Sequence, residues 1–158
     1  MDESKDDRRK YSRYDSELEV YFRTNYDIKT KVKFWIFKRR NLGQEPKYTA
    51  FSKNISAEGM CFYSEHQLKK NEQLSLEVYI PRQKEPILMV GEVKWSEPFS
   101  EEDRKAGRFY TGIKLLKVYN KTVAHTIYFD PTYQVVWSIV LESVFGSFRQ
   151  IAQKKTLD

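Results

Sequence analysis

The stretch Leu74-Ser75-Leu76-Glu77-Val78-Tyr79-Ile80 decides the fold class, because apolar side chains alternate in it with a period of two. That period predicts a β-strand with one buried face, and Pro81 ends it. Other segments rich in β-branched and aromatic residues predict strands at 18–22, 32–37, 48–55, 60–63, 87–95 and 108–116. Turn signals fall at 41–43, 58–59, 69–72 and 98–107. This series predicts a mainly β protein built as an antiparallel barrel.

Two of the predicted strands contain a glycine, Gly91 and Gly112. A glycine inside a strand indicates a β-bulge or a close approach of another group to the backbone. Cys61 lies in an apolar run and is interpreted as a core residue. Trp95 is interpreted as a residue of the core or of the barrel edge, with stacking on a base as the alternative.

The last part of the chain changes from the strand period to the helix period. Asp130 followed by Pro131 predicts the start of a helix, since Asp caps helices and Pro suits their first turn. Apolar residues then recur at spacings of three and four, at Trp137, Leu141, Val144, Phe145, Phe148 and Ile151. We expect this helix to pack on the barrel, with a homodimer through the helix as the alternative.

Composition favours one folded domain in a reducing compartment. The 158 residues are 40% hydrophobic and 15% aromatic, which is enough for a core, and the net charge of +6 favours anionic partners. The lone Cys61 excludes an intrachain disulfide, and no apolar leader follows Met1. The longest apolar run, at 135–141, is too short to span a bilayer. We therefore expect a cytoplasmic protein without a membrane span.

The sequence contains no pattern typical of an enzyme or a metal site. His66 and His125 stand apart, with no acidic or thiol residues at metal-ligand spacing. No Ser/His/Asp order, P-loop or G-x-G-x-x-G is present. We expect a binding protein with no catalytic residues, no metal and no cofactor.

An arginine cluster, Arg8-Arg9-Lys10-Tyr11-Ser12-Arg13, contains the pattern R-x-x-x-R. Arg9 and Arg13 share one side of the chain whether it is helical or extended. Guanidinium groups offer paired donors to a phosphate or to the edge of guanine. By itself the cluster also fits a solvated basic tail.

A second motif, Asn54-Ile55-Ser56-Ala57-Glu58-Gly59, has the pattern N-x-S-x-x-G. Asn54 could bind a base edge, and the Ser56 hydroxyl could bind a phosphate. Gly59 is expected to adopt a positive φ and to let backbone N–H groups approach an anion. Alone, this motif also fits a plain hairpin turn.

Together the two motifs and the strands after them resemble the PilZ domain, whose members bind the bacterial second messenger cyclic di-GMP. The resemblance covers roughly residues 8–117 and includes Gly91–Trp95 and Thr111–Leu115 as the family's late strands. It implies a six-stranded antiparallel barrel, to which the C-terminal helix predicted from the apolar spacing is appended. It also implies that Arg8, Arg9, Arg13, Asn54, Ser56 and Gly59 bind cyclic di-GMP, the arginine loop folding over the barrel face that carries the second motif.

The spacing between the two motifs is longer than is usual for the family. The extra length is expected at about 25–47, as a basic insertion, since residues 23–53 carry nine basic and two acidic side chains. The expected organisation is a flexible N-terminal arm at 1–16, the barrel at 17–118 and a helical appendage at 119–158.

The resemblance also indicates how many ligands bind and what they control. An arginine immediately before the R-x-x-x-R pair, here Arg8, favours a stacked pair of cyclic di-GMP molecules in the family. The receptor is expected to relay the signal to a downstream protein partner that the sequence does not identify. One alternative is a PilZ-like scaffold without nucleotide. A less favoured one is a nucleic-acid-binding barrel that uses Tyr26, Phe34, Trp35 and Tyr48 for stacking.

Overall fold

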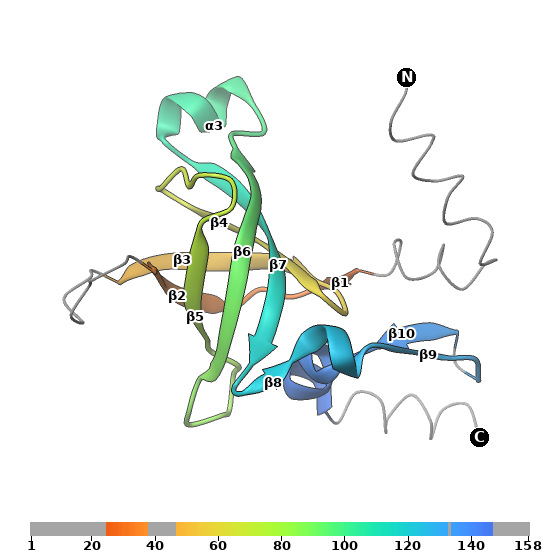
Figure 1. The fold of residues 1–158 in the computed structure, drawn as a ribbon. Helices are drawn as coiled ribbons and strands as arrows, with labels where there is room; N and C mark the ends of the chain where they lie inside the picture. Colours follow the sequence, from red (N-terminus) through yellow and green to blue (C-terminus); the bar gives the residue numbers. More distant parts are fainter. Residues whose placement is uncertain (1–24, 38–46, 133, 147–158) are drawn as a thin grey trace.

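A computed structural model describes residues 25–37, 47–132 and 134–146 (Figure 1). Six antiparallel strands form a closed barrel, in the order β3-β2-β5-β6-β7-β4, with β4 pairing back onto β3. Their bounds are β2 Lys31–Ile36, β3 Tyr48–Ile55, β4 Gly59–Ser64, β5 Gln73–Val78, β6 Ile87–Glu97 and β7 Phe109–Val118. The prediction of a six-stranded antiparallel barrel is therefore confirmed.

The interior of the barrel is filled by the apolar residues of each alternating strand. Leu74, Leu76 and Val78 of β5 point inward and are fully or almost fully buried, while Ser75 and Glu77 point outward. Phe34 and Phe62 face each other across the interior, with ring centroids 5.2 Å apart. Strand alternation thus separates an apolar interior from the outer face on which a ligand can bind.

Short elements extend the barrel at its ends. The two-residue strand β1 (Tyr26–Asp27) pairs with β3, and β8 (Lys121–Thr122) pairs with β7. A short helix, α3 (Glu101–Ala106), follows β6; Ser100 caps its start and Gly107, with φ of 70°, ends it. The 3-10 helix η1 (Val123–Thr126) follows β8.

The chain after η1 corrects the predicted start of the C-terminal helix. Asp130 ends strand β9 (Tyr128–Asp130), which pairs with β10 (Val135–Trp137), and the described part of the helix is 139–146. The Asp130 carboxylate accepts a hydrogen bond from Thr132 N at 3.0 Å, so it shapes the turn of a hairpin. The helix start predicted at Pro131 was wrong because β-branched and aromatic residues at 135–137 favour a strand.

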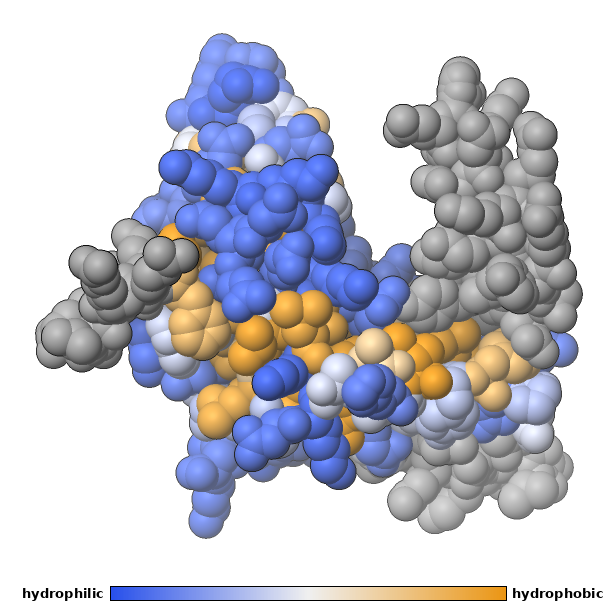
Figure 2. Space-filling view, viewed as in Figure 1, coloured by the Kyte–Doolittle hydropathy of each residue, from blue (hydrophilic) through white to orange (hydrophobic). Residues whose placement is uncertain are grey.

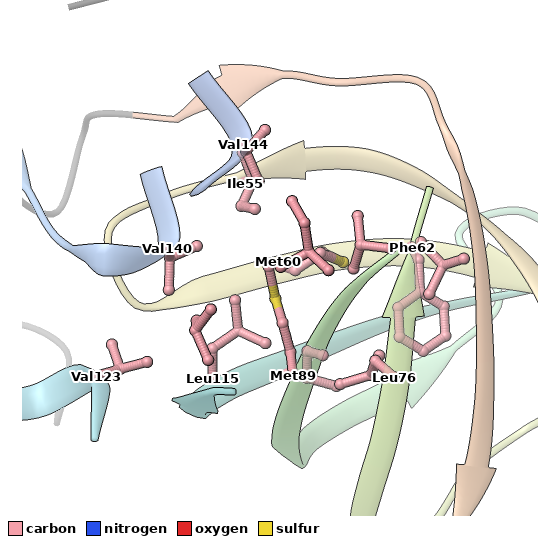
Figure 3. Packing of buried hydrophobic residues seen from close by; sticks show 14 of the residues in the cluster. Ile55, Met60, Phe62, Leu76, Met89, Leu115, Val123, Val140 and Val144 are labelled. Atoms are coloured by element: carbon pink, nitrogen blue, oxygen red, sulfur yellow. The ribbon is translucent and has the colours of Figure 1, made fainter. Parts of the chain in front are cut away.

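The C-terminal helix closes one end of the barrel. Val140 and Val144 point from the helix toward the barrel, with Val144 beside Ile55 (Figure 3), and all three belong to the buried core cluster. The ring of Tyr26 in β1 packs on Phe145 of the helix at 5.6 Å. Packing of the helix on its own barrel agrees with the expectation, and the homodimer stays a prediction. Phe148 and Ile151 lie outside the described residues.

The region of the expected basic insertion includes a strand of the barrel, because β2 pairs antiparallel with β3. Strand β2 lies between β3 and β5 in the barrel, so residues 31–36 are part of the fold itself. Its two lysines lie over one aromatic ring: Lys31 Nζ is 5.0 Å from the centre of the Tyr79 ring, and Lys33 Nζ is 5.9 Å from it. Residues 38–46 and the predicted strand at 18–22 lie outside the described residues.

The surface differs between the two ends of the molecule. The end that carries α3 is hydrophilic, whereas hydrophobic residues gather along β9 and β10 (Figure 2). None of the helices in the described part of the chain is long and apolar enough to be a candidate for crossing a membrane.

Candidate functional site

The N-x-S-x-x-G motif forms one wall of an open pocket on the outer face of the barrel. Asn54 ends β3, Ser56 begins the turn, and Gly59 begins β4. The pocket measures about 500 Å³ and is completed by β6 and β7. Its lining includes Asn25, Asn54, Ser56, Glu58, Gly59, Cys61, Lys94, Trp95, Gly112 and Lys114.

Backbone hydrogen bonds hold the motif turn in place. Ser56 N donates to the carbonyl of Gly59 at 2.9 Å, which closes the turn, and Leu115 N donates to the carbonyl of Glu58 at 2.7 Å, which fixes it to β7. The register of β3 with β4 shifts between Ser52 and Asn54. Such a bulge changes the direction of the next side chain, which here is Asn54 at the pocket.

Gly59 is required for space, not for an unusual φ. Among the described glycines, Gly107 is the one with a positive φ, so the expected positive φ at Gly59 was wrong. Gly59 pairs with Lys114 as a regular strand residue. A Cβ at this position would lie 3.1 Å from the carbonyl oxygen of Ile113 and 3.5 Å from Ser56 Oγ. A side chain at this position would therefore have to displace the backbone of the neighbouring strand β7.

Trp95 forms the opposite wall of the pocket, a position that we did not assign to a site. Its side chain is 38% exposed, and its indole lies against Gly112, where any Cβ would overlap the indole ring. The close approach expected at Gly112 is thus confirmed, and the approaching group is Trp95. The glycine inside the predicted strand was the signal for a close approach, but the sequence did not identify Trp95 as the approaching group.

The polar groups of the pocket are available to a ligand. The side chains of Asn54, Ser56 and Lys114 have no hydrogen-bond or ion-pair partner within the described ranges. Lys94 Nζ pairs with the Glu92 carboxylate at 3.1 Å. Unpaired amide, hydroxyl and ammonium groups in a concave site favour a polar, anionic ligand.

Cys61 lies in the floor of the pocket and is buried. Burial raises the pKa of its thiol, and the positive charge of Lys53 only partly opposes this effect. The thiol is consequently protonated at neutral pH and is a poor nucleophile. Cys61 contributes shape to the pocket.

Comparison with known proteins places the chain in a family. A family model described as PilZ domain matches residues 7–125. The chain belongs to the PilZ domain family. The match covers the arginine cluster, the N-x-S-x-x-G motif and all six barrel strands. No curated protein matches the chain.

Among solved structures, this PilZ chain is similar to the inhibitor of motility MotI/DgrA of Bacillus subtilis. The identity is 15% and the TM-score is 0.46. The similarity covers 82% of this chain and 50% of that chain, so the PilZ chain spans about half the length of the protein it matches.

The arginines of the first PilZ motif lie outside the described residues, so their role remains a prediction. These are Arg8, Arg9 and Arg13. The structure brings Asn54, Ser56 and Gly59 together in one pocket and adds Trp95 and Lys114 to them.

Proposed function

We propose that this PilZ protein is a cytoplasmic bacterial receptor of cyclic di-GMP. One observation carries the proposal: the free polar groups of Asn54, Ser56 and Lys114 meet in a pocket with an indole wall. The pocket combines donors for phosphate with an amide for a base edge and an apolar surface for a purine. A cyclic dinucleotide of guanine presents all three kinds of group.

Each residue of the pocket has a distinct part in the proposed complex. The Asn54 amide donates to and accepts from a guanine edge, and the Ser56 hydroxyl and the Lys114 ammonium bind phosphate oxygens. Trp95 packs on the purine. The absence of a side chain at Gly59 lets the ligand approach the backbone of the turn. Arg9 and Arg13 supply bidentate contacts from the other side of the ligand.

We further propose that two stacked molecules bind, because Arg8 adds a third guanidinium before the R-x-x-x-R pair. Two stacked dinucleotides bring four phosphates close together, and more positive charge is then needed to offset their repulsion. The bound receptor acts on a downstream protein partner, and no catalytic step is assigned to it.

The alternative function, a nucleic-acid-binding barrel, needs free rings for base stacking, and three of the four suggested rings are buried or in contact with other side chains. Phe34 is fully buried, and Tyr48 packs on it with ring centroids 5.3 Å apart. The Trp35 ring is covered by Lys47 Nζ at 5.3 Å. Bases cannot stack on rings that the fold already covers.

Calorimetric titration of the full chain with cyclic di-GMP tests the proposal, with GTP and cyclic AMP as control ligands. We expect binding of cyclic di-GMP alone, and a loss of about ten- to a hundredfold in affinity in Arg9→Ala and in Arg13→Ala. Arg104→Ala, an exposed arginine of α3, is the matched control and should bind normally. A wild-type chain that does not bind would favour the scaffold without nucleotide.

A further inference from the structure

Five aromatic side chains form an unbroken row across the outside of the barrel. Phe51 of β3 lies opposite Tyr63 of β4, which lies opposite Tyr110 of β7. Phe99, between β6 and α3, stacks on Tyr110 with ring centroids 4.2 Å apart and planes 9° apart. Trp95 of β6 completes the row at 5.8 Å from Phe99. The row therefore runs from Trp95, at the proposed nucleotide pocket, to Phe51 on β3.

Two rings of the row are exposed to solvent although they are apolar. Phe99 is 54% exposed and Phe51 is 44% exposed. None of the five rings belongs to the buried core cluster, which occupies the inside of the barrel. Contiguous aromatic surface outside the core is typical of protein interfaces, in which Tyr, Trp and Phe are enriched.

The orientation of the rings discriminates between classes of partner. A nucleotide base binds an aromatic residue by lying on a free ring face. Here Phe99 stacks on Tyr110 and, with planes 25° apart, on Trp95. Phe99, which lies between these two rings, presents mainly its edge, and a ring edge carries partial positive charge and contacts aliphatic groups or carboxylates well. The row fits a protein segment better than a nucleic acid.

Positive charge lies along the same surface. Lys53 Nζ is 4.9 Å from the centre of the Tyr110 ring and 5.5 Å from that of Phe99. Beside the row is a pocket of about 530 Å³, lined by Lys29, Thr30, Lys31, Phe51, Ser52, Lys53, Tyr63, Arg108 and Tyr110. Its lining contains four basic side chains and no carboxylate, although Arg108 pairs with Asp103 at 3.2 Å.

Two acidic residues border this surface: Glu97, and Glu65, which lines a further pocket together with Phe51 and Tyr63. Glu97 of β6 lies opposite Tyr110 and is exposed. The three lysines of the neighbouring pocket outnumber these two carboxylates, so the surface keeps a positive charge. Charge complementarity thus requires a partner that is acidic.

We propose that the row Phe51–Tyr63–Tyr110–Phe99–Trp95, with Lys53, is a docking surface for a partner protein segment that carries aliphatic and carboxylate side chains. The aliphatic groups of the partner cover the ring edges of Phe99 and Phe51, and a carboxylate pairs with Lys53. Four of the five rings and Lys53 lie outside the pocket assigned to cyclic di-GMP, so this proposal does not rest on the proposed function.

Fluorescence anisotropy of labelled probes with the full chain tests this surface. The probes are a peptide of alternating glutamate and leucine, its glutamine and lysine counterparts, and a thymidine oligonucleotide of similar length. We expect the glutamate peptide to bind best, and Phe99→Ser to weaken it about tenfold or more. Lys53→Gln should weaken it about threefold and reduce its salt dependence.

Matched controls show whether an effect is specific to the row or would follow from changing any exposed residue. Phe37 is 52% exposed and lies outside the row, so Phe37→Ser should leave peptide binding unchanged. Lys84→Gln, in the exposed turn between β5 and β6, is the control for charge. The proposal fails if the glutamate peptide does not bind, if it binds Phe99→Ser as well as wild type, or if the oligonucleotide binds more tightly than the peptide.

Discussion

The hydroxyl of Ser138 donates a hydrogen bond to the backbone carbonyl of Ala57, which ties the start of the C-terminal helix to the N-x-S-x-x-G turn. The same hydroxyl accepts a hydrogen bond from Val140 N at 3.1 Å and thereby caps the helix. Ala57 and Ser138 are 3% and 2% exposed, so water replaces neither bond easily. A ligand that displaces the turn would therefore also displace the start of the helix.

Ser138→Ala should destabilise the fold and loosen the motif turn. The substitution removes the helix cap and leaves the buried Ala57 carbonyl without its donor, at a cost of about 1–3 kcal/mol. Urea denaturation measures the cost, and titration measures the accompanying decrease in affinity for cyclic di-GMP. Ser143→Ala, on the same helix, should change neither quantity by more than about 0.5 kcal/mol.

Gly59→Ala should impair both folding and ligand binding. Its Cβ would lie 3.1 Å from the Ile113 carbonyl oxygen, a backbone atom that cannot move without shifting β7. We expect a loss of about 1–2 kcal/mol in unfolding free energy, measured by thermal or urea denaturation. Gly146→Ala is the contrasting variant, because among the described residues its Cβ meets only Glu142 Oε2, at 3.8 Å, and helix propensity should stabilise it by up to about 1 kcal/mol. Equal effects of the two substitutions would contradict this account of Gly59.

Gly112→Ala should push the Trp95 indole off the barrel face. The new methyl group overlaps the indole, so we expect a destabilisation of about 1–3 kcal/mol and a loss of cyclic di-GMP affinity. A double-mutant cycle isolates the contact: in a Trp95→Ala background, Gly112→Ala should cost much less stability. If the cost is the same in both backgrounds, the overlap with Trp95 is not its cause.

Glu77 should make the stability depend on pH in the acid range. Burial raises the pKa of this carboxyl group, but hydrogen bonds from Tyr79 at 2.8 Å and Lys47 at 3.2 Å outweigh burial and lower it overall. A lowered pKa in the folded state stabilises the fold above the unfolded value of about 4.3, and this contribution is lost as the pH falls through the folded pKa.

The variant Glu77→Gln tests this dependence. It should be less stable than wild type by about 1 kcal/mol at pH 7, and the difference should fade below about pH 4. Urea denaturation at both pH values measures it. Glu85→Gln, in the exposed turn before β6, should differ little from wild type at either pH. A difference between wild type and Glu77→Gln that persists at low pH would count against the charged hydrogen bonds.

Arg8→Leu should halve the number of bound cyclic di-GMP molecules. Loss of the third guanidinium removes positive charge that offsets the repulsion between two stacked ligands. Calorimetry at saturating ligand should give a ratio near two for wild type and near one for the variant, while Lys10→Leu should keep the wild-type ratio. A wild-type ratio near one would reject the stacked pair and leave the receptor assignment unchanged.

The sequence determined those features of this protein that depend on the order of neighbouring residues. Alternation in Leu74–Val78 and its counterparts marks the strands and their inner faces, because successive side chains of a strand point to opposite sides. The turn before β4 was predicted from Glu58 and Gly59, because glycine is common in turns. The arginine and N-x-S-x-x-G motifs were also visible in the sequence, and so was the resemblance to the PilZ family.

Only the tertiary structure decided how distant residues meet. The contact of Trp95 with Gly112, the bond from Ser138 to Ala57 and the aromatic row all join residues of different elements. These contacts depend on the closure of the barrel and on the strand register, including the shift between Ser52 and Asn54. The alternation of apolar and polar residues within one segment determines neither of them. The helix start was misplaced because Asp130 is as good a residue for a turn as for a helix cap, and the pairing of β9 with β10 favours the turn.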